Sequence, residues 1–198
     1  MIGTALLAVG FEHKSNATTQ TTQAPGLITL SSELQMPPAI ATDAGGQMKL
    51  TASHGTYDII NGPAKVKTRS FVQPGSNLLV GPTIRIKPGD TVNLNFTNNL
   101  NYSAADDGDG MMSDFIPHGF DVMNIHYHGM HVTPKSPGDN VLLNVFPANT
   151  PEQGMEACSH EVSKDVAHNH VCIKGSYPYS FKVPANHPAG SFWYHPHK

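Results

Sequence analysis

The chain has 198 residues, which is enough for one well-buried domain with a tail but too short for two full domains to be expected. Charged residues make up only 14% of it and the formal net charge is −3, so the composition argues against a polyanionic partner such as nucleic acid. No stretch approaches the roughly 18 consecutive apolar residues that cross a bilayer, and no membrane span is expected.

Histidine is the residue in excess, because twelve histidines stand against twelve lysines and arginines together. Imidazole is the commonest metal ligand among side chains and titrates near neutral pH. We expect roughly seven of the twelve to be ordinary surface residues. Metal binding is nevertheless the first functional class that the composition favours.

The first 45 residues differ in texture from the rest of the chain. Residues 1–11 look like the apolar part of a signal peptide, although they lack a basic start and a clear cleavage site. Residues 12–45 are rich in Thr, Gln, Ser, Ala and Pro, as linkers are. We therefore expect residues 1–45 to be a signal-peptide remnant and flexible arm, residues 46–198 to form the domain, and the protein to be secreted or periplasmic.

From Gln47 onward, short β-branched and aromatic runs alternate with Gly, Pro, Asn and Asp, a pattern typical of all-β proteins. The best-defined piece is residues 81–99, where apolar and polar residues alternate on both sides of a Pro-Gly-Asp turn at 88–90. This predicts two strands with one buried and one solvent-facing side each. Their pairing stays open, because neighbours in a Greek-key sandwich can lie in different sheets.

Three more strands are predicted over residues 141–146, 177–183 and 191–195, while residues 147–175 are interpreted as an excursion that carries both cysteines. In an oxidising compartment Cys158 and Cys172 would form one disulfide, which stabilises by about 3 kcal/mol in the chain-entropy model. Two alternatives remain, namely free thiols and a metal clip. The clip would use the histidines inside the loop, His160, His168 and His170.

Two His-x-His pairs carry the strongest functional signal, His126 with His128 and His195 with His197. On a strand, residues i and i+2 point to one face, roughly 6.5–7 Å apart at the backbone. Donor sets made of imidazole suit zinc, copper, iron or nickel and argue against magnesium or calcium. The spacing does not decide whether one pair chelates one ion or divides between two.

Three sequence blocks, residues 81–92, 125–131 and 187–197, resemble the first cupredoxin domain of laccase-type multicopper oxidases. The resemblance covers about residues 47–198. It implies an all-β fold, a Greek-key β-sandwich of cupredoxin type that is incomplete at its C-terminal end. It also implies that the chain is truncated after its second His-x-His motif.

In that family, electrons enter at a type 1 copper and pass to a trinuclear copper cluster between the first and last domains, where dioxygen becomes water. By position, His126 resembles the type 2 copper ligand, and His128 and His195 resemble ligands of one type 3 copper. His197 resembles a ligand of the other type 3 copper. Asp139 resembles the acidic residue that assists proton delivery, although an Asp-Asn pair is also an ordinary turn sequence.

The sequence departs from the family in two respects. It has no His-Cys-His block for a type 1 copper, and the 66 residues between His128 and His195 exceed the usual gap, which suggests an insertion at about 147–175. We expect the N-terminal part of a laccase-like oxidase, inactive alone and dependent on a C-terminal cupredoxin domain in the same chain or another subunit. Its partners would be dioxygen and a phenolic or metal-ion reductant. The alternative is a non-catalytic copper-binding module.

Overall fold

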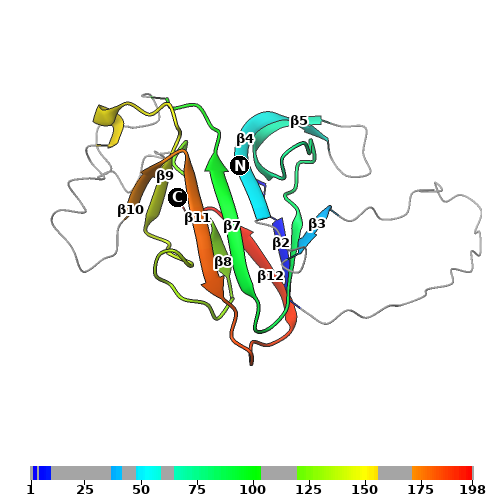
Figure 1. Ribbon diagram of the computed structural model, residues 1–198. Helices are drawn as coiled ribbons and strands as arrows, with labels where there is room; N and C mark the ends of the chain where they lie inside the picture. Colours follow the sequence, from blue (N-terminus) through cyan, green and yellow to red (C-terminus); the bar gives the residue numbers. More distant parts are fainter. Residues whose placement is uncertain are drawn as a thin grey trace, which may run out of the picture.

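The computed structural model describes residues 37–41, 48–58, 65–103, 120–155 and 171–197, together with the backbone of residues 2–3 and 5–9. In these ranges nearly all regular structure is β-strand, and the one helical element is the short 3-10 turn at Glu152–Met155. Figure 1 shows the strands layered face to face, with β7 and β11 in front of β8 and β12.

The strands form two five-stranded sheets and one strand pair. The first sheet has the order β1 (Ile2–Gly3), β5 (Lys65–Val72), β4 (Met48–Asp58), β7 (Thr91–Asn98), β11 (Ser176–Lys182). The second has the order β3 (Ala39–Ala41), β6 (Thr83–Ile86), β2 (Ala5–Val9), β12 (Gly190–His195), β8 (His126–His128). The pair consists of β9 (Leu143–Phe146) and β10 (Val171–Lys174), which run parallel.

The two strands predicted within residues 81–99 are confirmed as β6 and β7. Their apolar residues alternate inward as expected, and Val92, Leu94 and Phe96 are fully buried. The connecting turn places Gly89 at a φ of 92°, a conformation that favours glycine. The two strands do not pair with each other, because β6 belongs to the second sheet and β7 to the first. The chain crosses between sheets at this turn, as Greek-key sandwiches do.

The hydrophobic core fills the space between the two sheets. Phe71 of β5 packs edge-on against Phe96 in its own sheet, with ring centroids 5.9 Å apart, and against Tyr194 of the opposite sheet, 5.8 Å away. All three rings are fully buried. The all-β sandwich predicted from the sequence is confirmed, and the arrangement of its sheets is consistent with a cupredoxin-like fold.

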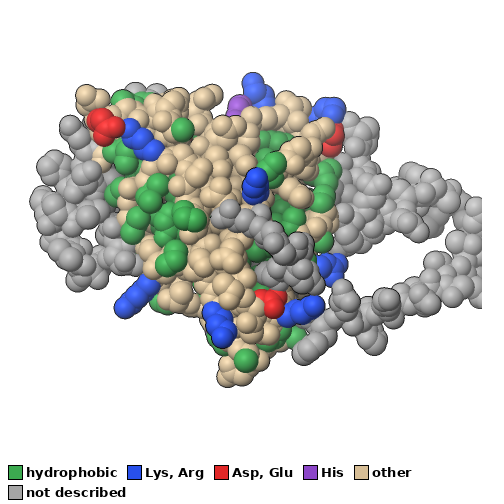
Figure 2. Space-filling model, in the orientation of Figure 1, with side chains coloured by type: hydrophobic (Ala, Val, Ile, Leu, Met, Phe, Trp, Pro, Cys, Tyr) green, Lys and Arg blue, Asp and Glu red, His purple; other side chains and the backbone are tan. Residues whose placement is uncertain are grey.

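The outer face of the first sheet is polar. Between β7 and β11, the Thr97 and Ser176 hydroxyls lie 3.0 Å apart, and the Ser180 hydroxyl donates to Asn93 Oδ1 at 2.9 Å. Figure 2 shows uncharged polar side chains and backbone over much of this face, with Lys and Arg side chains scattered rather than gathered. This sheet therefore presents one side to the core and the other to water.

The segment predicted as an excursion, residues 147–175, ends in a strand, and whether it is an insertion stays a prediction. Val171–Lys174 forms strand β10, paired with β9, and Val171 and Ile173 pack against the hydrophobic core. Two β-branched residues that can bury their side chains favour a strand over a loop. Cys172 lies in this strand and is not a free cysteine. Cys158 falls outside the described residues, as do the histidines of the proposed clip, so the disulfide stays a prediction.

The N-terminal segment contributes backbone to both sheets. Strand β2 lies between β6 and β12, and β1 pairs with β5. Strand β3, at residues 39–41, adds an edge to the second sheet. Residues 10–36 lie outside the described part, and the signal-peptide remnant, the arm and the domain boundary at residue 46 remain predictions.

No helix in the described part is long and apolar enough to cross a membrane.

Tyr127 offers a test of the core. Its hydroxyl is buried without a hydrogen-bond partner among the described residues, and burial raises the Tyr127 pKa well above its ordinary range. We expect Tyr127→Phe to stabilise the fold by about 1 kcal/mol, because an unpaired buried polar group is removed. The control is Tyr194→Phe, whose lost hydroxyl donates to the Pro82 carbonyl at 2.9 Å, and we expect it to destabilise by about 1 kcal/mol. Urea unfolding measures the free energy of unfolding of both variants. A Tyr127→Phe protein that is less stable than the wild type would contradict the conclusion that the Tyr127 hydroxyl is buried without a partner.

Candidate metal site

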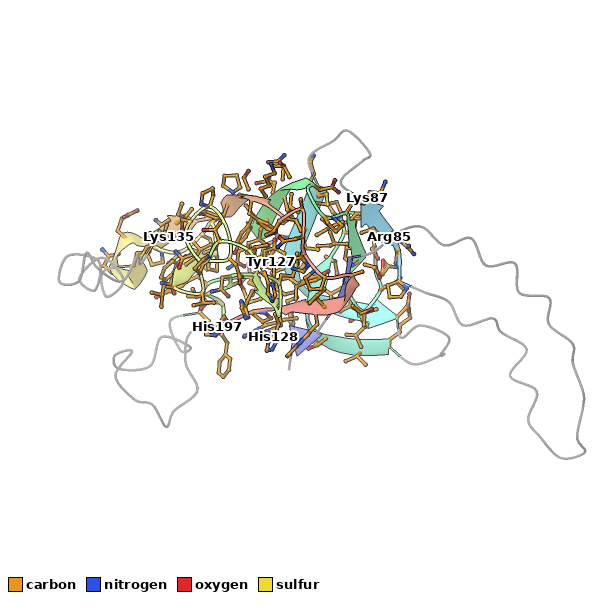
Figure 3. The ribbon with its side chains drawn as sticks, turned by 90° about the horizontal axis from the view of Figure 1, so that it is seen from below. Arg85, Lys87, Tyr127, His128, Lys135 and His197 are labelled. Carbon is orange, nitrogen blue, oxygen red and sulfur yellow. The ribbon has the colours of Figure 1, made fainter. Side chains whose placement is uncertain are left out.

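Strand β8 carries the first histidine pair, and the antiparallel strand β12, which ends at His195, brings the start of the second pair beside it. In their register His126 lies opposite His195, and Tyr127 lies opposite Tyr194. The side chains alternate, so both tyrosines are buried in the core while the histidines point to the other side. Figure 3 shows Tyr127 among the interior side chains. The ligand face predicted from the i, i+2 spacing is therefore formed by two strands together.

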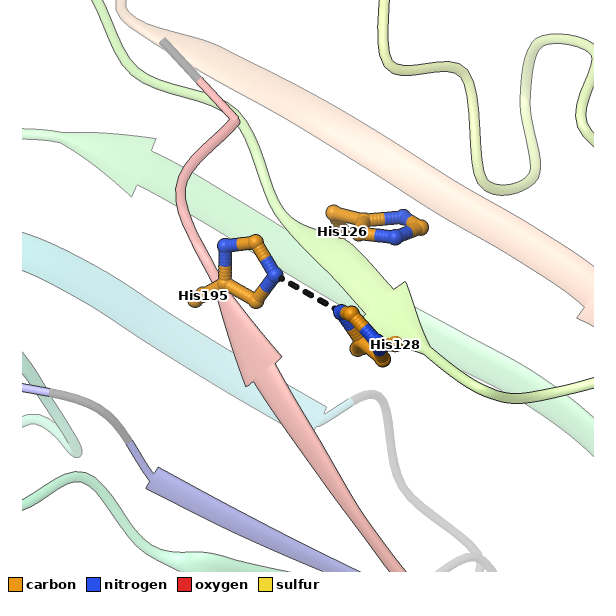
Figure 4. Close-up of side chains that lie close together, drawn as sticks. All are labelled: His126, His128 and His195. Carbon is orange, nitrogen blue, oxygen red and sulfur yellow. Dashed lines mark hydrogen bonds between the residues drawn. The ribbon is translucent and has the colours of Figure 1, made fainter.

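Three imidazoles converge on this face. One ring nitrogen each from His126, His128 and His195 lies within 4.8 Å of the others, in a half-exposed setting (Figure 4). The ring centroid of His126 is 5.5 Å from that of His128 and 5.2 Å from that of His195. The closest approach joins His128 Nδ1 to His195 Nε2 at 3.3 Å. Such a group of three imidazoles could hold a metal ion.

The His128–His195 spacing can be compared with that of known metal ligands. Bonds of about 2.0 Å at a tetrahedral angle place two ligand nitrogens roughly 3.3 Å apart. The nitrogens of His128 and His195 have this separation. Imidazole donors suit copper, zinc, iron or nickel, and the donor set therefore fits a transition metal.

Asp139 orients His126. The loop after β8 returns so that His126 Nδ1 lies 3.0 Å from Asp139 Oδ1 and 2.9 Å from Oδ2, while the Tyr127 amide donates to Oδ1 at 2.9 Å. Asp139 is 7% exposed and is itself held by its amide, which donates to the Thr133 carbonyl. A carboxylate at Nδ1 fixes the proton there and leaves Nε2 as a metal donor.

We expect Asp139→Asn to lower metal affinity about 10- to 100-fold, because outer partners of ligand histidines contribute on that scale. The amide keeps the size of the carboxylate but removes the charge that stabilises the Nδ1 proton of His126. Copper titration by calorimetry measures the change. Asp90→Asn, in the turn between β6 and β7, is the control. Equal copper affinities of Asp139→Asn and the wild type would show that Asp139 does not contribute to the site.

His197, the fourth predicted ligand, lies beside the cluster of three. Its ring centroid is 5.4 Å from that of His126 and 6.5 Å from that of His195. Its backbone amide donates to Asn124 Oδ1 at 2.7 Å. Asn124 is fully buried, and its Nδ2 donates to the carbonyls of Val141 and Leu143. The sequence reasoning missed Asn124, although a lone amide within an apolar stretch was a signal.

Trp193 covers two of the imidazoles. Its ring stacks on His128, with centroids 4.5 Å apart and an interplanar angle of 26°, and on His195 at 4.3 Å and 27°. The indole is 41% exposed, so it lies between these two rings and solvent. Such stacking restricts both imidazoles to a narrow range of orientations.

Three basic side chains, Arg85, Lys87 and Lys135, lie away from His128 and His197 (Figure 3). His131 is not in the group of three, because β8 ends at His128 and Gly129, at a φ of 84°, turns the chain away. The arrangement offers imidazole nitrogens together with the Asp139 carboxylate, a donor set that suits a cation.

Comparison with known proteins adds little to this geometry. No family model matches the sequence, and no curated protein matches it. A similar solved structure is a bacterial laccase-like multi-copper oxidase, CueO, from the lignin-degrading bacterium Ochrobactrum sp., described as having oxidase activity towards lignin model compounds and lignosulfonate. The identity is 21% and the TM-score 0.45, over 83% of this chain and 25% of that one. The chain thus spans about a quarter of that structure's length.

Proposed function

We propose that this chain is the N-terminal part of a laccase-like multicopper oxidase and supplies half of the ligands of its trinuclear copper cluster. The observation that carries the proposal is the convergence of His126, His128 and His195 within 4.8 Å, on strands that are far apart in the sequence. The resemblance of the three sequence blocks supports the same assignment. In the parent enzyme, a C-terminal cupredoxin domain would supply the remaining ligands.

The proposed roles follow the geometry of each side chain. His128 and His195, with nitrogens 3.3 Å apart, would hold one type 3 copper, and His126 would hold the type 2 copper through the nitrogen that Asp139 leaves free. His197 would hold the other type 3 copper. Asp139 keeps a proton on His126 Nδ1, and its predicted second role in proton delivery is part of the proposal.

Bound copper would supply electron transfer to dioxygen, since four one-electron oxidations of a phenolic or metal-ion reductant provide the electrons that, with four protons, convert one dioxygen into two waters. The side chains of this chain bind and orient. Tyr127 and Tyr194 anchor the two strands in the core, and Trp193 limits the water that reaches His128 and His195 from one side.

Copper(II) titration of the full chain, followed by electron paramagnetic resonance, tests the proposal. We expect binding with hyperfine coupling to imidazole nitrogens and no intense blue band, because a type 1 thiolate site is absent from the proposed ligand set. Absence of nitrogen coupling would contradict the ligand assignment. A strong blue band would contradict the assignment of the cluster type.

A non-catalytic copper-binding module is the second candidate, and it is favoured by the fact that three converging imidazoles already come from this one chain. The two functions differ when a C-terminal cupredoxin domain of the same family is added. Oxygen uptake with a phenolic reductant, gained only in that mixture, supports the oxidase. Copper binding without any oxygen uptake in the mixture supports the module. Export to the periplasm or outside the cell is part of the proposal.

A further inference from the structure

His187 is a buried histidine that neither His-x-His motif includes. It lies in the turn between β11 and β12 and is 5% exposed. Its ring centroid is 5.3 Å from that of His131, which follows β8. The residue therefore connects the turn before the second histidine pair to the turn after the first.

Both ring nitrogens of His187 are engaged. The His131 backbone N–H donates to Nε2 at 3.0 Å, so Nε2 carries no proton. The proton then resides on Nδ1, which lies 2.9 Å from the Pro188 carbonyl and donates to it. One tautomer of a neutral imidazole satisfies both bonds. No other single side chain of the twenty offers this donor and acceptor on one rigid ring.

Phe192 tightens the same contact. Its ring packs edge-on against His187, with centroids 5.2 Å apart. It also lies against Gly129, where an added Cβ would come within 3.2 Å of Phe192 Cδ1. The turn after β8 is thus held from two sides by the segment that leads into β12.

The metal-binding strands need such a contact. Strand β8 has three residues, lies at the edge of its sheet and pairs with β12 through three residue pairs. A strand pair this short has little stability of its own. The His128–His195 spacing of 3.3 Å nevertheless depends on its register. Something outside the ladder must hold β8 in place.

We propose that His187 is a positioning residue that fixes β8 against β12, and with it the spacing of the metal ligands, through the acceptor Nε2. The proposal rests on the metal-binding role proposed above. Among the described residues, the hydrogen bonds and ring contacts of His187 do not include the proposed ligands. It acts through the His131 amide, and Phe192, which packs on it, contacts the Gly129 turn.

Two variants of similar size test the acceptor nitrogen Nε2 and the donor Nδ1–H of His187 separately. In His187→Gln the side-chain oxygen can reach the position of Nε2 and accept from His131, whereas in His187→Asn the amide can replace only Nδ1–H. We expect the Asn variant to bind copper(II) about 10- to 100-fold more weakly, the range of other positioning partners, and the Gln variant to stay within a few-fold of wild type. His54→Asn, at an exposed histidine of β4, is the control.

The metal-free chain provides a second measurement. Amide hydrogen exchange at residues 126–128 and 193–195 is expected to speed up in His187→Asn and to stay near wild type in His187→Gln. If His187→Asn does not fold, Phe192→Leu leaves both hydrogen bonds of His187 in place while removing the ring that packs on it. That variant is expected to bind copper several-fold more weakly and to exchange faster over the same residues.

Each outcome decides a separate question. Unchanged copper affinity and exchange in His187→Asn and Phe192→Leu would overturn the positioning role while leaving the proposed function intact. Equal losses in the Asn and Gln variants would overturn the role of Nε2. If the wild-type chain itself binds no copper, the proposed function fails, and the exchange experiment still reports whether His187 holds β8.

Discussion

Copper affinity is expected to fall by more than about 100-fold when His126 and His128 are both replaced by Ala. Loss of outer partners alone costs about 10- to 100-fold, and this double variant removes two of the three converging donors. The remaining imidazoles, His195 and His197, have ring centroids 6.5 Å apart. Calorimetric titration with copper(II) gives the affinity, and paramagnetic resonance shows whether the imidazole coupling is lost.

The control for the double variant is His54→Ala. His54 is an exposed histidine of β4 and lies outside the group of three, so the control removes an imidazole from another part of the surface. We expect it to bind copper as the wild type does. If the double variant and this control bind equally, the first His-x-His pair is structural and copper affinity arises elsewhere.

Phe71→Ala is expected to lower the free energy of unfolding by about 3–5 kcal/mol, the usual cost of emptying a buried phenylalanine site. Phe71 is fully buried and contacts rings of both sheets, Phe96 and Tyr194, so the cavity would open at the centre of the sandwich. Neighbouring strands hold these rings in place and limit collapse into the space. Urea unfolding at constant pH measures the loss.

Phe120→Ala is the control for the core variant. Phe120 is 43% exposed, and its ring contacts the Arg69 guanidinium at 5.4 Å. We expect a loss below about 1 kcal/mol, because an exposed cation–π contact contributes about 0.5–1 kcal/mol. Comparable losses in Phe71→Ala and Phe120→Ala would show that the contacts between the sheets are not the main source of stability.

The sequence predicted where the strands lie better than it predicted which strands pair. Alternation of apolar and polar residues over 83–98 identified β6 and β7, because burial on one face imposes a period of two. Pairing depends on contacts between distant segments, which leave no local pattern. The parallel pairing of β4 with β7 and the position of β10 beside β9 therefore became visible only in the structure.

The residues of the candidate site were also predictable only in part. The histidine pairs were readable because two donors at i and i+2 on a strand share a face regardless of what the strand packs against. Asp139 was predicted only from its resemblance to the acidic residue of the oxidase family. Its contact with His126 depends on how the loop after β8 folds back. Asn124 and His187 act through backbone groups of other segments, so their side chains alone gave no indication of their partners.

The hydrogen bond between the His197 amide and Asn124 joins residues 73 positions apart, and the contact between His128 and His195 joins residues 67 apart. Closing chain segments of this length costs conformational entropy before any contact compensates for it, and such contacts therefore form late in folding. The three-histidine group cannot form until the strands that lie between the two His-x-His segments in the sequence have folded into the sandwich. The ability to bind copper with three imidazoles together should thus appear late in refolding, after β8 and β12 have paired.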